Sequence, residues 1–171
     1  MANLRKPLRL NVGFLINSPI GISREFFFES LTVTSDDDLQ ISDIEGMAKI
    51  SRTPQGLLVE ANFGGHISLD CVRCLESYEQ VLRWEFVELF AFTRDNITDS
   101  GLLVPDDAHL DLQPLVYDYA MLEIPSTPIC KPSCQGLCME CGQNLNVRDC
   151  GHSPENDSPF SALKKLLNPE D

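Results

Sequence analysis

The sequence predicts an α+β fold in which an antiparallel β body carries one middle helix and continues into a cysteine-rich C-terminal segment and a short final helix. Three observations support this prediction. Short apolar runs separated by polar breaks fill most of the first two thirds of the 171 residues. Apolar residues at helical spacing occur later, over residues 112–122. The last part of the chain holds five of the seven cysteines.

The β body is predicted from five apolar segments that are bounded by proline, glycine or polar residues. In the last segment Leu82, Trp84 and Phe86 alternate with charged residues, which indicates a strand with one buried face. The third and fourth segments are expected to pair across a four-residue turn, and the fourth and fifth to form a hairpin. The five segments are Arg9–Ile16, Arg24–Val33, Ile44–Arg52, Gly56–Leu69 and Val81–Phe92.

A long exposed loop and the middle helix follow the strands. Residues 93–109 are polar and rich in aspartate, which favours a loop. Asp111 is expected to cap the helix, and Pro125 and Pro128 to end it. Its apolar stripe has the spacing of one helical face and is expected to pack in the core. The stripe consists of Leu112, Leu115, Val116, Tyr119 and Leu122.

The C-terminal part is predicted to be ordered by something other than a hydrophobic core. From Cys130 to His152 there are few large apolar residues and many cysteines. Ser158 and Pro159 are typical of a helix start, and Phe160, Leu163 and Leu167 then line one face of a short helix. We therefore expect a β-rich body over residues 1–127 and a cysteine-rich segment with its helix over 128–171, packed on the body.

The cysteine spacing indicates zinc. Two C-x2-C pairs, Cys71/Cys74 and Cys138/Cys141, each place two thiolates on one side of a tight turn. Gly142 allows the backbone turn of such a knuckle. With no secretory signal visible at the N-terminus, clustered cysteines more often mean metal than disulfides. Cys71 lies between two strands rather than at a helix start, which disfavours a thioredoxin-like redox motif.

Seven cysteines and one nearby histidine could supply two tetrahedral Zn²⁺ sites. Chain order favours one site of Cys71, Cys74, Cys130 and Cys134, and a second of Cys138, Cys141, Cys150 and His152. One ribbon-like site made from the two C-x2-C pairs remains an alternative, as do free thiols or disulfides. Because protein ligands would fill every position, either arrangement would be structural rather than catalytic.

The net charge of −13 argues against broad contact with nucleic-acid phosphates. Residues 35–127 carry most of the acidity, with 18 acidic and five basic residues. Such a surface would attract a basic protein partner. No run of 18 apolar residues is present, so we expect no membrane span, and we expect a cytoplasmic protein without a small-molecule substrate.

Several motifs together resemble the large ribosomal RNA subunit accumulation proteins, the YceD-type family. The resemblance covers most of residues 60–168 and is strongest in a C-x-G-L-C-x-x-C-G-x-N-L-N run. One departure is that His152 stands where the family often has a second cysteine of a C-x-C pair. The similar segments are Cys71–Leu75 between two strands, Asp111–Pro125, Cys134–Asn146 and Ser158–Leu166.

The resemblance implies a role in the accumulation or processing of 23S ribosomal RNA, without a catalytic activity. It implies a large-subunit precursor as the partner, through a basic ribosomal protein, with L32 a candidate, or through the RNA itself. Direct RNA contact would fall to a few basic residues. These are Arg73 in the first knuckle and Arg5, Lys6, Lys164 and Lys165 near the chain ends.

The alternative function is a metal-dependent nuclease. Asp36, Asp37 and Asp38 are the best candidate among the aspartate clusters to hold Mg²⁺, and a solvated acidic turn is the simpler interpretation. No nucleophile elbow, H-E-x-x-H helix or phosphate-binding glycine loop occurs in the sequence. The sequence therefore favours a non-enzymatic factor.

Overall fold

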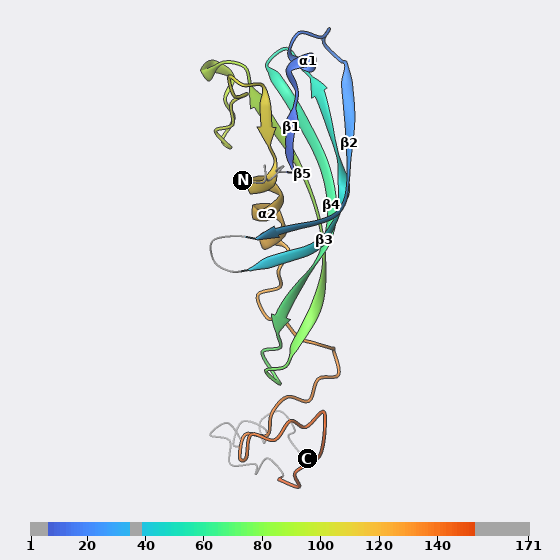
Figure 1. The fold of residues 1–171 in the computed structure, drawn as a ribbon. Coiled ribbons are helices and arrows are strands. Elements are labelled where there is room, and N and C mark those ends of the chain that lie inside the picture. The colour runs from blue at the N-terminus through green and yellow to red at the C-terminus, as the bar shows by residue number, and fades with distance from the viewer. Residues whose placement is uncertain (1–6, 35–38, 153–171) are drawn as a thin grey trace, which may run out of the picture.

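The computed structural model describes residues 7–34 and 39–152, and one four-stranded antiparallel sheet dominates it (Figure 1). The strands follow one another as a meander, in the order β2-β3-β4-β5. The β4–β5 hairpin extends beyond the rest of the sheet, toward the cysteine-rich segment (Figure 1). The strand bounds are Ser23–Thr34 for β2, Gln40–Arg52 for β3, Gly56–Asp70 for β4 and Ser77–Ala91 for β5.

Alternation along the strands gives the sheet one apolar face and one mixed face. In β4, Val59, Ala61 and Phe63 are buried, while Glu60 and Asn62 between them point the other way. The predicted alternation of Leu82, Trp84 and Phe86 is confirmed, since all three are buried. The ring of Phe63 lies at the centre of this inner face, with ring centroids of Phe28, Trp84 and Phe86 at 5.6, 6.0 and 6.3 Å. These contacts form the centre of the core.

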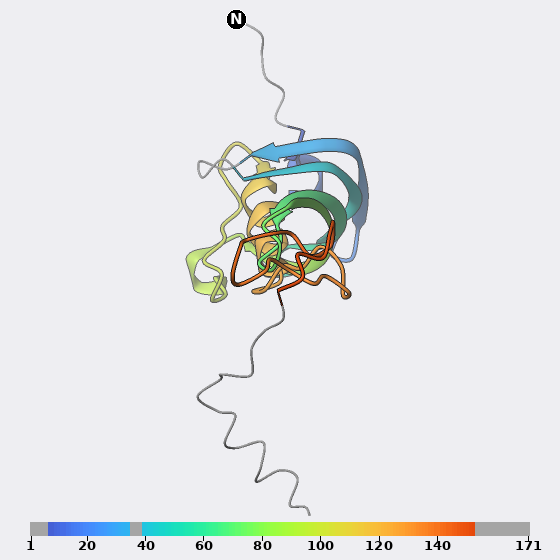
Figure 2. The same ribbon diagram turned by 90° about the horizontal axis from the view of Figure 1, so that it is seen from below.

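Smaller elements cover the inner face. The helix α2 (Gln113–Leu122) buries Val116 and Ala120 against it, and the ring of Tyr119 stacks on Phe86 at 4.9 Å. A two-stranded pair of β1 (Arg9–Asn11) and β6 (His109–Asp111) contributes Leu10 and Leu110. The sheet curls around α2 and this pair (Figures 1 and 2).

The structure corrects several sequence-based expectations about single elements. The segment Arg9–Ile16 is a strand only as far as Asn11, because Val12 begins a turn that leads into the short helix α1 (Gly13–Ile16). Residues 93–109 are not entirely an exposed loop. They contain the 3-10 helix η1 (Arg94–Asn96). The Leu102 carbonyl also accepts the N–H of Ala91, and the Val104 N–H donates to the Ala91 carbonyl, which pairs this stretch with Ala91.

Two details of α2 also differ. Asp111 is not the N-cap, which is Leu112, but its carboxylate accepts the N–H of Gln113 at 3.0 Å. Leu122 does not join the buried stripe and is 77% exposed, whereas Ala120 takes the buried position. The stripe fails at its last residue because the helix extends past the edge of the core.

The predicted α+β class is therefore confirmed at the level of an antiparallel sheet with helices. The described ranges contain no helix that is long and apolar enough to cross a membrane. The predicted final helix at Ser158–Leu167 lies outside the described residues. The division into residues 1–127 and 128–171 stays a prediction.

Candidate metal centres

The first pair of cysteines lies at the tip of the β4–β5 hairpin, as the sequence predicts. The last paired residues are Asp70 and Ser77, and the Ser77 hydroxyl donates to Asp70 Oδ1 at 2.6 Å. This contact closes the mouth of a tight turn that holds Cys71 and Cys74.

The turn is a knuckle formed by two backbone hydrogen bonds. Cys71 N–H donates to the carbonyl of Glu76 at 2.9 Å, and Leu75 N–H donates back to the carbonyl of Cys71 at 2.8 Å. Leu75 has a φ of 60°, in the left-handed region. The backbone therefore turns both thiols of the C-x2-C pair to one side.

The second pair repeats this pattern. Cys138 N–H donates to the carbonyl of Gln143 at 2.8 Å, and Gly142 N–H donates to the carbonyl of Cys138 at 2.9 Å. Gly142 has a φ of 72°, so the expected turn at this glycine is confirmed. An antiparallel bridge between Leu137 and Asn144 closes the second knuckle.

Cys130 and Cys134 come to the hairpin tip from the segment that follows α2. The N–H of Val72 in the first knuckle donates to the carbonyl of Pro128 at 2.9 Å, which anchors this segment beside the tip. Cys71, Cys74 and Cys134 then form a small buried cluster, with Cys130 packed against it. This cluster is separate from the main core.

The four sulfurs of this first cysteine group have the spacing of a zinc site. All of them lie within 4.8 Å of one another, and the Cys71–Cys134 and Cys74–Cys130 sulfurs are 3.8 Å apart. Four sulfurs at about 2.3 Å from a central zinc ion would lie about 3.8 Å from each other, whereas a disulfide requires about 2.05 Å. The donor set and its spacing therefore fit Zn²⁺ and do not fit disulfides.

The surroundings of the first group lower the pKa of some of its thiols and raise the pKa of others. Backbone N–H groups, that of Cys130 first, lower the pKa of Cys71 to about 6. Burial and then the neighbouring sulfurs raise the pKa of Cys130 to about 12. Four crowded thiolates repel each other, so a divalent cation is needed to balance them all in the charged form.

Cys138, Cys141, Cys150 and His152 form the second group, again with ligand atoms within 4.8 Å of one another. His152 Nδ1 lies 3.8 Å from the Cys138 sulfur. Backbone N–H groups of Cys141 and Glu140 lower the pKa of Cys138 to about 6. Cys138 is buried, whereas Cys141 and His152 are exposed, so this group is more open to solvent than the first.

Hydrogen bonds join the two groups into one unit. The Asn146 side-chain amide donates to the Cys134 sulfur at 3.3 Å, and its oxygen accepts the N–H of Gln135 at 2.9 Å. The Asn144 amide donates to the Glu76 carboxylate in the hairpin at 2.8 Å. Residues next to the second group therefore hold both a ligand of the first group and the hairpin tip.

Arg73 also connects the hairpin to the cysteine-rich segment. Its guanidinium donates to the carbonyl of Cys134 at 3.1 Å, and its own carbonyl accepts the N–H of Leu137 at 3.0 Å. Gly136 packs so closely that an added Cβ would lie 3.1 Å from the Arg73 carbonyl. The guanidinium thus bonds a carbonyl and does not cap a sulfur, and its predicted contact with RNA stays a prediction.

The family described as large ribosomal RNA subunit accumulation protein YceD matches residues 59–167, which include both cysteine groups. The chain belongs to the YceD family. The resemblance predicted from the knuckles and the second C-x2-C run is therefore confirmed, and the family's description concerns accumulation of the large ribosomal RNA subunit.

Individual relatives extend this comparison. An uncharacterized protein of Mycobacterium tuberculosis is 29% identical over 163 residues, covering 91% of this chain and 72% of that protein. The chloroplastic YCED homolog 1 of Arabidopsis thaliana is 39% identical over 64 residues, or 36% of this chain and 20% of that protein. The uncharacterized protein YlbN of Bacillus subtilis is 25% identical over 144 residues, covering 82% and 84%. No solved structure matches the chain.

The two groups of this YceD-family chain have the same members as the two-site partition expected from chain order. The single ribbon-like site is not the arrangement found, because Cys71 and Cys74 face Cys130 and Cys134 instead of Cys138 and Cys141. Sequence reasoning missed the bracing role of Asn146 and the left-handed Leu75. Five further candidates lie outside the described residues, namely the nuclease run 36–38 and the basic residues Arg5, Lys6, Lys164 and Lys165.

Proposed function

We propose that this YceD-family chain is a non-enzymatic assembly factor that supports accumulation of 23S ribosomal RNA by binding a basic ribosomal protein, the precursor RNA, or both. Membership of the family is the observation that carries this proposal. The family name ties the chain to the large subunit but does not specify a partner. Ribosomal protein L32 is one candidate for the basic partner, although the names of the relatives do not mention it.

The two cysteine groups support a structural rather than a catalytic use of metal. In the first group four protein sulfurs, three of them in buried residues, surround one point and leave no position for a substrate or water. Zinc bound there would cross-link the hairpin tip to the segment after α2. The chain's own residues, Asn146 and Arg73 among them, would then hold the two knuckles in a fixed relation.

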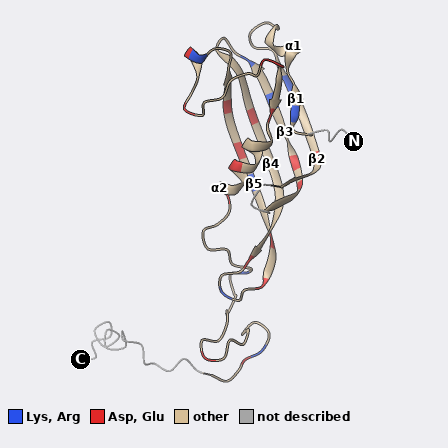
Figure 3. Ribbon diagram, turned by 60° about the vertical axis from the view of Figure 1, so that its left-hand side comes forward, with Lys and Arg blue, Asp and Glu red and all other residues tan. Residues whose placement is uncertain are grey.

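The distribution of charge supports different binding roles for the acidic body and for the knuckles. Acidic residues recur along the long strands, and few basic residues stand between them (Figure 3). Such a body repels phosphate, so any RNA contact belongs to the knuckle end, where Arg73, Lys131 and Arg148 are exposed. We expect the chain in the compartment where large subunits assemble, which in a bacterial cell is the cytoplasm.

Depletion followed by complementation tests this function. We expect depletion to lower the ratio of 23S to 16S ribosomal RNA, and the wild-type chain but not Cys74→Ser to restore it. An unchanged ratio after complete depletion would contradict the proposal. Incubation of the purified zinc-loaded chain with a 23S precursor transcript tests the absence of catalysis, because specific cleavage would favour the nuclease alternative.

A further inference from the structure

The outer face of the four-stranded sheet, opposite the core, is not covered by any helix or strand of residues 7–34 and 39–152 (Figure 2). It nevertheless exposes large apolar side chains. Phe27 in β2 is 71% exposed, and Val87 in β5 is 63% exposed. Both alternate with buried core residues, so each points away from the core. Exposed apolar side chains gathered on one face of a sheet are typical of an interaction surface.

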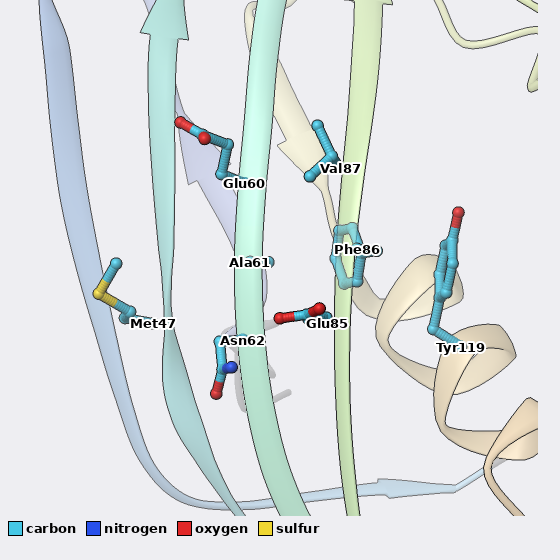
Figure 4. Close-up of a pocket in the computed structure, with 8 residues that line it drawn as sticks. All are labelled: Met47, Glu60, Ala61, Asn62, Glu85, Phe86, Val87 and Tyr119. Carbon is cyan, nitrogen blue, oxygen red and sulfur yellow. The ribbon is translucent and has the colours of Figure 1, made fainter.

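The centre of this outer face is hollowed. One hollow of about 510 Å³ runs from Met47 across Asn62 to Val87 and reaches Phe86 and Tyr119 of α2 at the β5 edge of the sheet (Figure 4). A second of about 500 Å³ lies between Phe27 and the same Met47 and Asn62. The strand register explains why the two are neighbours, because Phe27, Met47, Asn62 and Glu85 are successive partners across β2, β3, β4 and β5. Together the hollows form one shallow trough that crosses all four strands.

Glutamates line the trough. Glu29 and Glu45 lie beside the second hollow, and Glu60 and Glu85 beside the first. Among the described residues that line either hollow there is no lysine or arginine. Lys49 is a neighbour and pairs with Glu60 at 3.7 Å, which leaves the other three carboxylates without this cation. The trough therefore combines an apolar floor with a strongly acidic margin.

The apolar floor and acidic margin of the trough favour some binding partners over others. Phosphates of RNA would meet several glutamates and, among the residues that line the hollows, no lysine or arginine, so the electrostatics of the trough disfavour nucleic acid. A second copy docked face to face would place glutamates against glutamates, and each copy has a net charge of −13. A basic protein segment gains from both features, because cationic groups reach the carboxylates while apolar stems or side chains fill the floor.

We propose that the trough across β2–β5 is the docking surface for a basic segment of a ribosomal protein, with an apolar residue or an arginine stem seated between Phe27 and Met47. The exposed ring of Phe27 adds a face on which a guanidinium can stack. The inference deepens the proposed function by naming a surface and the chemistry of its partner. It rests on that function only for the choice of ribosomal proteins as the pool of partners.

A pair of charge-reversal variants tests this surface. Glu45→Lys with Glu85→Lys changes the trough, and Asp95→Lys with Asp99→Lys makes the same change of charge at exposed positions after β5. Each zinc-loaded chain is immobilised and titrated with proteins that high salt has extracted from purified large subunits, and bound proteins are identified by mass spectrometry. We expect the trough variant to weaken binding at least ten-fold and the control variant less than two-fold. Equal weakening would show a general charge effect and overturn the proposal.

The apolar floor has its own test, which does not depend on charge. Phe27→Ser is expected to weaken the same binding about ten-fold, while Leu122→Ser, at an equally exposed leucine of α2, leaves it unchanged. A photo-reactive residue at position 27 should cross-link to a peptide rich in lysine and arginine from a ribosomal protein. Cross-links to ribosomal RNA, to another copy, or to this chain's own residues 1–6 or 153–171 would each overturn the proposal.

The failure of this inference can be told apart from the failure of the proposed function. If depletion leaves 23S RNA unchanged but the trough variant still loses basic partners, the surface survives and the function fails. If depletion lowers 23S RNA and the trough variant fully restores it and binds normally, the function survives and the surface fails.

Discussion

Leu75 and Gly142 occupy the same position in the two knuckles. Each is the fourth residue after the first cysteine of its pair, and each donates its N–H to the carbonyl of that cysteine, at 2.8 Å for Leu75 and 2.9 Å for Gly142. Their φ angles are 60° and 72°. A leucine therefore holds a left-handed position that glycine fills in the other knuckle, at a cost of about 1–2 kcal/mol.

This equivalence predicts an asymmetric result for exchange of the two residues. Gly142→Leu should weaken zinc binding by the second group about 5–30-fold, because about 1–2 kcal/mol of left-handed strain is added to the folded knuckle. Leu75→Gly should change the affinity of the first group by less than about 5-fold, since relief of strain is offset by the greater backbone freedom of unfolded glycine. Competition with a chromophoric chelator measures both. A large loss in Leu75→Gly would show that the leucine side chain itself stabilises the knuckle.

The stoichiometry of metal is the second prediction. Mass spectrometry under native conditions should find two zinc ions per chain, and Cys74→Ser should reduce the count to one. His152→Ala should leave the first ion in place and weaken the second, because His152 belongs only to the second group. A wild-type count of one would contradict the two-site arrangement.

Asn146→Ala tests the bond to the Cys134 sulfur. Outer-shell partners of a metal ligand typically contribute 10–100-fold in affinity, and Asn146 holds Cys134 from a residue beside the second group. We expect the zinc affinity of the first group to fall by about this factor. Val147→Ala, at the next and exposed position, is the matched control and should behave as wild type. Equal affinities in Asn146→Ala and wild type would remove Asn146 from this role.

A pH-dependent prediction concerns Tyr119, whose hydroxyl donates to the Glu88 carboxylate at 2.7 Å. This hydrogen bond and burial raise the pKa of Tyr119 above its ordinary value of 10.0. A pKa raised in the folded state means that the stabilisation is complete below about pH 10 and is lost as the pH rises through the folded value. Tyr119→Phe should therefore unfold with about 1 kcal/mol less free energy at pH 8, with the difference from wild type vanishing at strongly alkaline pH.

Urea unfolding from pH 8 to 11 checks this prediction, with Tyr117→Phe on the same helix as the control. The ring stack on Phe86 is kept in Tyr119→Phe, so the difference isolates the hydroxyl. A difference that does not change with pH would show that the hydrogen bond to Glu88 contributes nothing to the shift.

Loss of an aromatic ring should reduce the free energy of unfolding strongly on the inner face of the sheet and very little on the outer face. Phe63→Ala should reduce the free energy of unfolding by about 3–5 kcal/mol, because Phe63 is 1% exposed and lies among three other rings. Phe27→Ala, at a ring that is 71% exposed, should change it by less than about 0.5 kcal/mol. Urea denaturation measures both, and a stability loss of several kcal/mol in Phe27→Ala would place its ring in the fold rather than at a docking surface.

Much of the fold can be predicted from local patterns in the sequence. Alternation at Leu82, Trp84 and Phe86 predicts which face of β5 is buried, and the helical spacing around Val116 predicts α2. The residues at which these elements begin and end cannot be predicted from the same patterns. The strand expected over Arg9–Ile16 ends after Asn11, and Leu122 leaves the core, since both depend on where a neighbouring element stops.

In the candidate metal centres, too, some features can be predicted from the local sequence and others cannot. Ligand type and the C-x2-C spacing are local features, and they predict both knuckles from residues that are close in the chain. Asn146 carries no such signal, because an asparagine in a polar loop is ordinary until its amide is found against a sulfur. Leu75 likewise reads as an exposed apolar residue, and only its φ angle shows that it serves as the turn residue.

The sequence by itself determined the class of the fold, the candidate metal ligands, the family and the acidic charge of the body, because these depend on composition and on contacts between near neighbours. The tertiary structure decided which cysteines face one another, since Cys71 and Cys134 are brought together only by the hydrogen bonds that anchor the segment after α2 at the hairpin tip. It also decided that glutamates from β2, β3, β4 and β5 surround one trough, because strand register, which is a long-range property, aligns Phe27, Met47, Asn62 and Glu85 in a single row.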